Sequence, residues 1–441
     1  MALDRRTFLA RAGLTAAASS LVSGCSTPAC ALTSAEGALD WAAVRGLFNL
    51  APDWIHLASF FLVSHPKPVR EAIDEYRRRL DANPMWLEEV MFADGHEHLQ
   101  DRLKAAIAPY VGGRPEEIAL VPNTTTGLAL LYNGLRIRPG QEILTTEHDH
   151  YSHHESIRLA SDKNGASVRR IALHDGAAGA RESVMVERLR RAITPRTRAV
   201  GLTWVHSSTG LRLPIPALAE VVGAANAGRD EADRCLLIVD GVHGFGCSDA
   251  AAATLGCDFF AAGTHKWIFG PRGTGLIWGR ADAWPHVRPT VPSFESLEPF
   301  GRWAADQPLD PKTRAGWVAP GGFCAYEHYF AVEAAFRLHA ELGRARIAAR
   351  IAELNGRFRT ELAGMKHVTL HTPVAPALAA GIVCFEVEGL TPHQVVERLK
   401  ARRIVASTSP YAVSYARVCA GIMVSPEEIE TTLREIRALS A

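Results

Sequence analysis

The sequence predicts an α/β protein, with a mostly parallel sheet in a large first domain and a smaller α+β domain at the carboxyl end. Three observations lead to this prediction. Strand-like and helix-like segments alternate between residues 117 and 279, as expected for a parallel sheet covered by helices on both faces. The segment CLLIVDGVHG (235–244) is almost continuously apolar, as in a strand buried on both faces. After about residue 295 the alternation gives way to two long helices and then short strands.

The composition is that of a globular protein. The chain has 441 residues, which is long enough for two domains with sizeable cores. Hydrophobic residues make up 47% and charged residues 22%, and the formal net charge is +1. This near-neutral balance gives no indication of a nucleic acid partner.

The first 31 residues predict an export signal. The pair Arg5-Arg6 precedes a weakly apolar stretch without charges that ends at Cys25. This stretch is shorter than the roughly 20 residues that span a bilayer, so it favours a twin-arginine signal over a membrane anchor. LVSGC resembles a lipoprotein box with Cys25 lipidated, whereas ACA (29–31) resembles a cleavage site that ends at Ala31. We expect a periplasmic protein exported by the twin-arginine translocase. The sequence leaves open whether the signal ends in lipidation at Cys25 or in cleavage after Ala31.

The elements of the large domain, expected over residues 45–295, follow from apolar spacing. Helical spacing predicts helices over 66–82 and around 99–107. The expected sheet elements are then strand 117–122, helix 126–135, strand 141–148, strand 198–210 with a turn, helix 215–226, strand 235–244, strand 258–267 and strand 274–279.

The smaller domain is expected over residues 296–441. Its predicted elements are helices 324–342 and 344–364, strands 367–371 and 381–388, and helices 392–402 and 425–439. Catalytic residues are expected where this domain meets the carboxyl ends of the parallel strands, because ligands bind there in open α/β sheets.

Polar residues follow several of the predicted strands. Asp240 ends the most apolar strand, where a carboxylate is costly to bury unless it meets a cation. Lys266 follows about one crossover and one strand later, in GTHKWIFG, among bulky apolar groups. A turn-capping aspartate and a surface lysine are the alternative interpretations of these two residues.

Two further motifs lie at strand ends. The hydroxyls and amides of NTTTG (123–127) could hold a phosphate at the positive end of a helix, although any Ser/Thr helix cap looks similar. His148 follows a strand directly, in TTEHDHYSHH (145–154). The histidines of that segment could instead bind a metal, but no second cluster with matching carboxylates stands out, so we predict no metal site. The cysteines outside the signal are predicted to be buried small hydrophobes, since no C-x-x-C spacing occurs.

Together these residues are the parts of a pyridoxal 5′-phosphate (PLP) site. The aldehyde of this cofactor needs one lysine, and its pyridine nitrogen needs an anion that keeps it protonated. The phosphate needs helix amides, and the ring needs a flat partner. The sequence therefore predicts PLP as the cofactor.

The motifs also resemble a known family. Their order, NTTTG…TTEH…VHSSTG…VDGVHG…GTHKW…GPRGTG, is similar to that of the class V aminotransferases of PLP fold type I, over about residues 45–441. IHLASF, GTHKW and APGGF…YEHYFAVEAAF resemble the isopenicillin N epimerase-like branch. With its export signal, the chain is also similar to periplasmic members that tailor the amino-terminal glutamate of pyoverdine siderophores. The resemblance implies a seven-stranded, mostly parallel sheet and a homodimer with shared active sites.

The resemblance implies a role for each matching residue. Lys266 would bind the cofactor aldehyde as an imine, Asp240 would face the pyridine nitrogen, and His148 would stack on the ring. Arg417, in YARVC, would grip a substrate carboxylate with its bidentate fork. The other implied site residues are His243 and Ser207 near the ring oxygen, Thr125, Thr126, Thr264 and His265 at the phosphate, and Ser59 and Phe60 at the substrate.

Three departures from relatives qualify these roles. Ser207 stands where many relatives place an asparagine against the ring hydroxyl. Ala319 stands where cysteine desulfurases place a phosphate-binding threonine from the second subunit, which puts that role of APGG in doubt. The stretch IVASTSPYAVSYAR (404–417) contains no cysteine, so persulfide chemistry is disfavoured.

The predicted activity is proton chemistry at the amino-bearing carbon of an amino acid or peptide, with Lys266 as general base and acid. Return of the proton to the opposite face of the resulting carbanion gives epimerisation, and return to the cofactor gives transamination, as in the tailoring of a siderophore. Loss of a β- or γ-group, as in an amino acid lyase, is an alternative. A non-catalytic binding lipoprotein on the same fold is the alternative from another class. The sequence leaves the substrate open.

Overall fold

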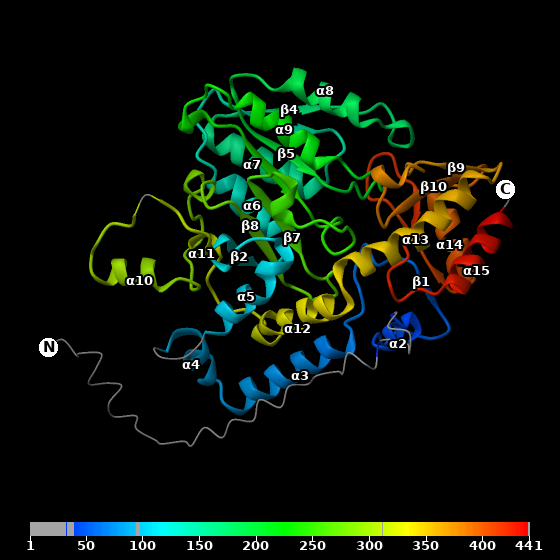
Figure 1. Cartoon of the computed structure of the whole chain (residues 1–441), viewed down its shortest axis with the longest axis horizontal. Helices are drawn as coiled ribbons and strands as arrows, with labels where there is room; N and C mark the ends of the chain where they lie inside the picture. Colours follow the sequence, from blue (N-terminus) through cyan, green and yellow to red (C-terminus); the bar gives the residue numbers. More distant parts are fainter. Residues whose placement is uncertain (1–31, 33–38, 94–97, 311, 440–441) are drawn as a thin grey trace.

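The computed structural model describes residue 32 and residues 39–93, 98–310 and 312–439 (Figure 1). The predicted export signal, with Cys25 and Ala31, lies outside these residues. The described strands form sheets of seven, four and two strands. None of the described helices is long and apolar enough to cross a bilayer.

The seven-stranded sheet has the order β2-β8-β7-β6-β5-β3-β4. Its strands are β2 (Ile118–Val121), β3 (Glu142–Thr146), β4 (Ser167–Ile171), β5 (Thr197–Thr203), β6 (Leu236–Asp240), β7 (Phe259–Gly263) and β8 (Gly275–Gly279). β8 runs antiparallel to β2 and β7, and the remaining neighbours are parallel. The predicted mostly parallel sheet of a PLP fold type I protein is confirmed.

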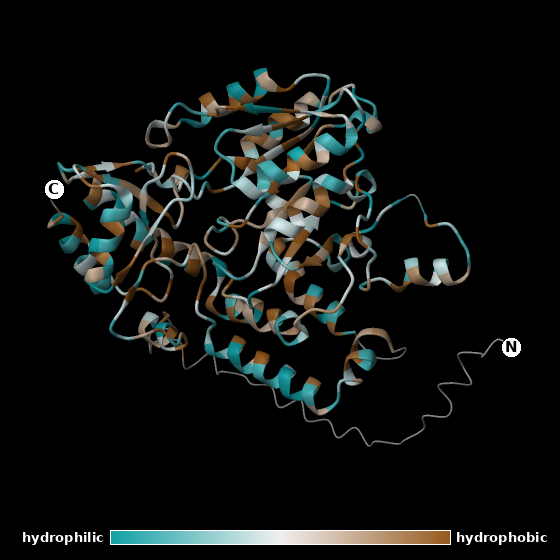
Figure 2. Ribbon diagram, turned by 180° about the vertical axis from the view of Figure 1, so that it is seen from behind, coloured by the Kyte–Doolittle hydropathy of each residue, from teal (hydrophilic) through white to brown (hydrophobic). Residues whose placement is uncertain are grey.

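Helices cover both faces of this sheet, so alternate strand residues pack into two cores. In β6, Leu236 and Ile238 pack with helices α6 and α7, whereas Leu237 and Val239 pack with α8 and α9. These helices are α6 (Thr124–Gly134), α7 (Tyr151–Asn164), α8 (Glu182–Ala192) and α9 (Ile215–Ala225). Burial on both faces explains why β6 is continuously apolar. Figure 2 shows this distribution, with hydrophobic residues concentrated in the strands.

The four-stranded sheet is antiparallel, in the order β12-β13-β10-β9. Its strands are β9 (Val368–Leu370), β10 (Val383–Val387), β12 (Ser407–Thr408) and β13 (Ala416–Val418). Helices α13 (Arg344–Ala363), α14 (Pro392–Ala401) and α15 (Pro426–Arg437) pack on it around a separate apolar core. Near this sheet, β1 (Ile55–His56) pairs with β11 (Ile404–Val405) in the two-stranded sheet, so the start of the described chain lies beside its end. The domain boundary predicted at residue 295 stays a prediction.

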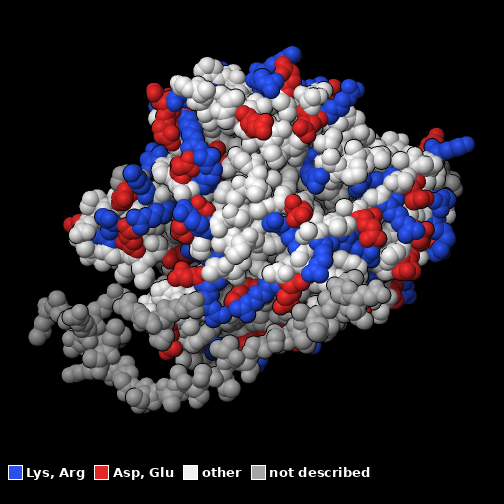
Figure 3. All heavy atoms as spheres, in the orientation of Figure 1, with Lys and Arg blue, Asp and Glu red and all other residues white. Residues whose placement is uncertain are grey.

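The remaining helices connect these parts. The long helix α12 (Tyr326–Leu342) packs along α3 (Lys67–Ala82) and α5 (Leu99–Val111). Helices α2 (Trp41–Gly46) and α4 (Trp86–Phe92) flank α3, α11 (Ala315–Val318) contacts β2, and α10 (Leu297–Ala304) lies on a loop that stands off from the body (Figure 1). On the face drawn in Figure 3, positive and negative side chains are interspersed around a broad uncharged area.

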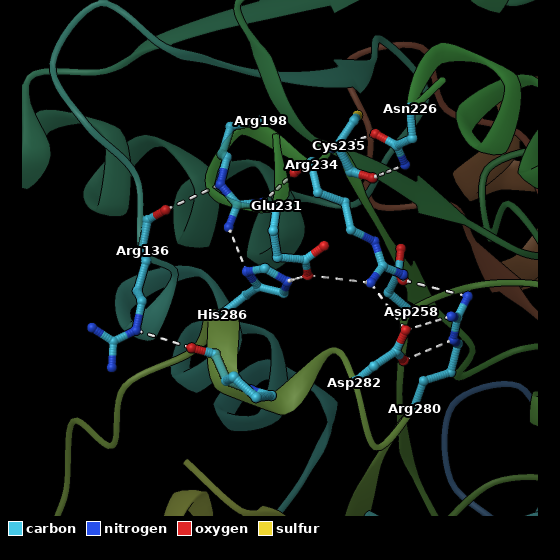
Figure 4. Close-up of polar contacts among 11 residues, drawn as sticks. Arg136, Arg198, Asn226, Glu231, Arg234, Cys235, Asp258, Arg280, Asp282 and His286 are labelled. Carbon is cyan, nitrogen blue, oxygen red and sulfur yellow. Dashed lines mark hydrogen bonds and ion pairs between the residues drawn. The ribbon is translucent and has the colours of Figure 1, made fainter. Parts of the chain in front are cut away.

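A polar network closes the sheet at the amino ends of β5, β6 and β7 (Figure 4). The buried side chain of Arg198 donates to the main-chain carbonyl oxygens of Arg136 and Arg234, and its Nη2 lies 3.1 Å from Nδ1 of His286. Nε2 of His286 in turn lies 2.8 Å from Oε1 of Glu231. The buried polar groups of Arg198 and His286 therefore find their hydrogen-bond partners within this cluster.

Asp258 is the anionic centre of the same network. Its Oδ1 accepts a hydrogen bond from Nη2 of Arg234 at 2.6 Å, and its Oδ2 accepts one from the main-chain N–H of Leu237 at 2.8 Å. Asp282, which is half exposed, accepts hydrogen bonds from Arg234 and Arg280 at the edge of the cluster. Burial raises the pKa of Asp258, and its donors oppose this shift.

Candidate active site

A cavity of about 280 Å³ lies at the other edge of the same sheet, at the carboxyl ends of β5, β6 and β7. Eight of the site residues predicted from the sequence line it: Phe60, Thr125, Ser207, Asp240, His243, His265, Lys266 and Arg417. Because the carboxyl ends of parallel strands meet at one edge, residues far apart in the chain come together there.

Lys266 projects into the cavity from the loop after β7. Its Nζ lies 3.3 Å from Nε2 of His243. The loop is anchored by Trp267, which is fully buried and packs so closely on Gly381 that a Cβ there would lie 2.3 Å from the indole. Burial lowers the pKa of Lys266 to about 8, with Asp240 opposing the shift and Arg417 adding to it. The side chain is therefore a better nucleophile at neutral pH than an exposed lysine.

Asp240 closes the floor of the cavity. It ends β6 with 2% of its surface exposed, and its Oδ1 accepts a hydrogen bond from the N–H of Val242 at 3.1 Å. Burial raises the pKa of this carboxyl group, and His153, the Val242 N–H and Lys266 oppose the shift, in decreasing order of effect. A buried carboxylate at this position suits a cationic ring nitrogen, which would offset the cost of its burial.

The start of α6 forms another wall. The side chain of Asn123 caps this helix by accepting the N–H of Thr126 at 2.9 Å. Thr124 Oγ1 accepts the N–H of Gly263 at 2.8 Å, which ties the helix to the end of β7. Thr125 faces the cavity beside His265, so the unpaired amides of the first helical turn lie where an anion would bind. Burial, with a smaller contribution from Lys266, lowers the pKa of His265 to about 4, so its imidazole is neutral.

Three predicted residues do not line the cavity. Thr126 offers its N–H to Asn123, and Thr264 Oγ1 contacts the hydroxyl of Thr274. Ser59 is buried with its Oγ 3.6 Å from Sδ of Met423. Each of these hydroxyl or amide groups has a local partner, so their predicted contacts with phosphate or substrate are not supported by their positions.

His148 also lies outside the cavity, so its position does not support the prediction that it stacks on the cofactor. Its ring stacks on His174 instead, with centroids 3.9 Å apart and planes 10° apart. The neighbouring Asp149 is buried and accepts hydrogen bonds from Thr145 Oγ1 at 2.7 Å and from the N–H of Thr203 at 2.9 Å. This turn places His150, rather than His148, on the cavity wall.

Arg417 reaches the cavity from β13 of the small sheet. Its Nη1 donates to the main-chain oxygen of Ser207 at 2.9 Å, and its guanidinium lies 4.1 Å from the centroid of the Phe60 ring. Its buried Nε has no hydrogen-bond partner among the described residues. Burial lowers the pKa of this group, since water no longer solvates the charge. A carboxylate that binds here would satisfy the unpaired donor.

Several lining residues were not predicted individually. They are Phe61, Asn123, Thr124, His150, Ser152, Thr203, Val242 and Pro410. Asn123 and Thr124 belong to the NTTTG motif, and His150 lies two residues from the predicted histidine, so the sequence held a signal for these. Phe61 and Pro410 lie on loops without any signature.

Among the described residues, no group of three or more His, Cys, Asp or Glu side chains is arranged to hold a metal ion. The described cysteines are free, and all of them are buried except Cys324, which is exposed and so differs from the prediction.

The sheet, the lysine at its carboxyl edge and the facing buried carboxylate define a PLP-dependent enzyme of fold type I. The sequence model of the family described as aminotransferase class-V matches residues 64–434. The chain therefore belongs to the class V aminotransferase family, which confirms the predicted enzyme class and cofactor.

Curated relatives with two activities resemble the chain. Isopenicillin N epimerase of Streptomyces clavuligerus is 27% identical over 91% of this chain and 98% of its own length. The epimerase of Amycolatopsis lactamdurans is 28% identical over 78% of this chain and 84% of its own. A probable cysteine desulfurase of Halalkalibacterium halodurans is 25% identical over 79% of this chain and 81% of its own.

Solved structures share the fold. A mutant of C-DES with glycine covalently linked to its PLP cofactor superposes with a TM-score of 0.77 at 22% identity, covering 90% of this chain and 99% of that one. The apo cysteine desulfurase of Thermococcus onnurineus superposes with a TM-score of 0.74 at 22% identity, covering 89% of this chain and 96% of that one.

Proposed function

We propose that this PLP-dependent enzyme removes and returns the proton on the amino-bearing carbon of an amino acid or peptide that carries a free carboxylate. One observation carries this proposal. The buried amine of Lys266 shares one cavity with the carboxylate of Asp240 and with the partly unpaired guanidinium of Arg417. A base, a ring-nitrogen partner and a carboxylate donor are the groups that such chemistry needs.

The residues of the cavity fit the cofactor. Lys266 would hold its aldehyde carbon, Asp240 its ring nitrogen and His150 one face of its ring. The phosphate would bind at the first turn of α6 with Thr125 and His265. His243 and Ser207 would lie near the ring oxygen. When bound, PLP supplies an electron sink that stabilises negative charge on the amino-bearing carbon.

The chain's own groups would then move the proton. Lys266 would be the base, because its lowered pKa of about 8 leaves more of its amine unprotonated at neutral pH than in an exposed lysine. His243, 3.3 Å away, is neutral since burial and the nearby Lys266 lower its pKa well below the ordinary value. Its imidazole can therefore orient the lysine amine without adding a competing charge. Arg417 would hold the substrate carboxylate with its unpaired Nε.

Two fates of the proton fit this site. Epimerisation is supported by the epimerase relatives, which align along most of the chain. Transamination, as in the tailoring of a siderophore peptide, is the second fate. The twin-arginine pattern at residues 5–25 would bring a folded, PLP-loaded enzyme to the periplasm, where such a peptide could be its substrate. Lyase chemistry is a third candidate, since the structural neighbour C-DES is a cystine C-S lyase. A desulfurase reaction is disfavoured, since residues 404–417 contain no cysteine that could serve as its nucleophile. The homodimer that the resemblance implies is part of the same proposal.

The test is proton exchange in deuterated water with the PLP-loaded enzyme. L-Alanine, L-glutamate and a peptide with amino-terminal glutamate serve as probes, analysed by mass spectrometry and chiral chromatography. Deuterium with inversion supports epimerisation, and a keto product supports transamination. Lys266→Ala should lower exchange by at least about a hundredfold. Absence of exchange, of keto product and of side-chain loss with every probe would contradict the proposal.

A further inference from the structure

A tyrosine of the small sheet reaches the active site from the loop between β12 and β13. Oη of Tyr411 lies 2.7 Å from Oγ of Ser207, which lines the cavity. The preceding residue, Pro410, lines the same cavity. The stretch 404–417, which includes this loop, contains no cysteine.

Ser207 joins two groups of the small sheet at once. Its hydroxyl contacts Tyr411, while its main-chain oxygen accepts the Nη1 donor of Arg417 at 2.9 Å. Tyr411 and Arg417 therefore both bind Ser207, in the loop after β5. Tyr411 contacts the serine side chain, and Arg417 contacts the serine main chain.

The phenol is held in its protonated form. Burial raises the pKa of Tyr411 to about 12, although its hydrogen bond to Ser207 opposes the shift. The charged and titratable groups that face it are Asp240, Asp149 and Arg417, with the ring of His150 edge-on at 6.0 Å between centroids. At neutral pH the Oη–H can therefore donate to Ser207.

We propose that Tyr411 is a positioning residue, which orients the Ser207 hydroxyl toward the ring oxygen of PLP and fixes the loop that leads to Arg417. The proposal rests on the function proposed above, in which Ser207 faces that oxygen. A side-chain amide is planar and presents its N–H in a fixed direction, whereas a serine hydroxyl rotates freely. Donation from Tyr411 occupies a lone pair of Ser207 and leaves the serine proton for the cofactor, which compensates for the asparagine that this chain lacks.

A hydrogen bond to the ring oxygen stabilises the deprotonated chromophore, so it lowers the pH midpoint of the near-visible absorption of the PLP-loaded enzyme. Tyr411→Phe removes the orienting donor and should raise that midpoint by about half a unit to one unit. Ser207→Ala should raise it at least as much. The double variant should shift the midpoint no further than Ser207→Ala, because Tyr411 acts through Ser207.

Tyr415→Phe is the matched control. Tyr415 lies near the end of the same loop, but its ring stacks on His371 at 3.8 Å, outside the cavity. This variant should keep the wild-type midpoint. Thermal unfolding of all four variants shows whether a shifted midpoint comes with a general loss of stability. A general loss of stability would not shift the midpoint in Tyr411→Phe and Ser207→Ala while leaving it unchanged in Tyr415→Phe.

A wild-type midpoint in Tyr411→Phe, or additive shifts in the double variant, would overturn this inference. The inference stands if the midpoints shift as expected while none of the amino acid probes exchanges its proton, and only the proposed function then fails. A wild-type protein that takes up no coenzyme would overturn both.

Discussion

The two edges of the seven-stranded sheet are built on opposite principles. At the amino edge, Arg198 and Asp258 are buried and Arg234 is half-buried, and each makes two or more hydrogen bonds within one network. At the carboxyl edge, Asp240 is buried and Lys266 is half-buried, but their partners are few. Nδ1 of His243 and Nε of Arg417, both buried, have no partner among the described residues. Buried groups without partners destabilise a fold and are available to a ligand.

This difference indicates a division of labour along each strand. β6 ends in Asp240, and near its start the N–H of Leu237 donates to Asp258, which directly precedes β7. A saturated carboxylate therefore lies at one end of this apolar strand and a reactive one at the other. We therefore expect substitutions at the amino edge to change stability with little effect on chemistry. Substitutions at the carboxyl edge should do the reverse.

The largest effect on stability is expected for Asp258→Ala. It leaves the Arg234 guanidinium partly unpaired and the Leu237 N–H without its acceptor, which should lower the free energy of unfolding by about 3–5 kcal/mol. Denaturant unfolding of the coenzyme-free protein measures this change. Asp282→Ala, at the exposed edge of the same network, should cost no more than about 1 kcal/mol. If the two substitutions lowered the free energy of unfolding equally, the buried network at the amino edge would not stabilise the fold as described.

The lowered pKa of Lys266 predicts how coenzyme uptake depends on pH. Only the unprotonated amine attacks an aldehyde, so the rate of reaction of coenzyme-free protein with PLP should rise about tenfold per pH unit below 8. The rate should level off above about 8, where the amine is already deprotonated. Stopped-flow absorption across a pH series measures it, with N-acetyl-lysine as the exposed reference. A rate that keeps rising toward pH 10, as for the reference amine, would show that burial does not tune this lysine.

Arg417→Lys sharpens the comparison on the substrate side. Lysine keeps the charge but loses the fork and the free Nε donor, so KM for a carboxylate substrate should rise about 10–100-fold. Coenzyme affinity should not change, because Arg417 is not among the residues proposed to hold it. Arg402→Lys, in an exposed ion pair with Glu435, is the control and should leave KM unchanged. An unaltered KM in Arg417→Lys would remove this residue from the substrate site.

The smallest expected effect distinguishes two histidines of one turn. His150→Ala removes a flat side chain from the cavity wall and should weaken coenzyme binding about tenfold. His148→Ala removes a ring that stacks on His174 and should leave coenzyme affinity unchanged. Equilibrium titration with PLP measures both. The opposite result would restore the stacking role predicted for His148 from the sequence.

Much of the large sheet and part of the site can be predicted from local patterns in the sequence. The apolar run of β6 with its terminal Asp240, and Lys266 within its apolar loop, were predicted from the sequence because burial on both faces leaves a continuous hydrophobic signal. The edge strand β4 was missed because its side chains are only partly buried and include two arginines. Short strands such as β1 are defined by a distant partner, so they leave no local signal.

Side-chain direction was the less predictable part of the site. The turn after β3 is shaped by Asp149, whose hydrogen bonds to Thr145 and Thr203 decide that His150 and not His148 faces the cavity. Thr264 lies in the motif of Lys266, yet its hydroxyl pairs with Thr274. These outcomes depend on contacts between segments far apart in the chain, which spacing within one motif does not report.

The most direct test of the account is the site of attachment of the coenzyme. The protein should be incubated with excess PLP, reduced with borohydride, digested and mapped by mass spectrometry. We expect a pyridoxyl adduct on Lys266, and the loss of both this adduct and the near-visible absorption in Lys266→Ala. A reduced protein with no adduct at Lys266, or with its stoichiometric adduct on another lysine, would contradict it.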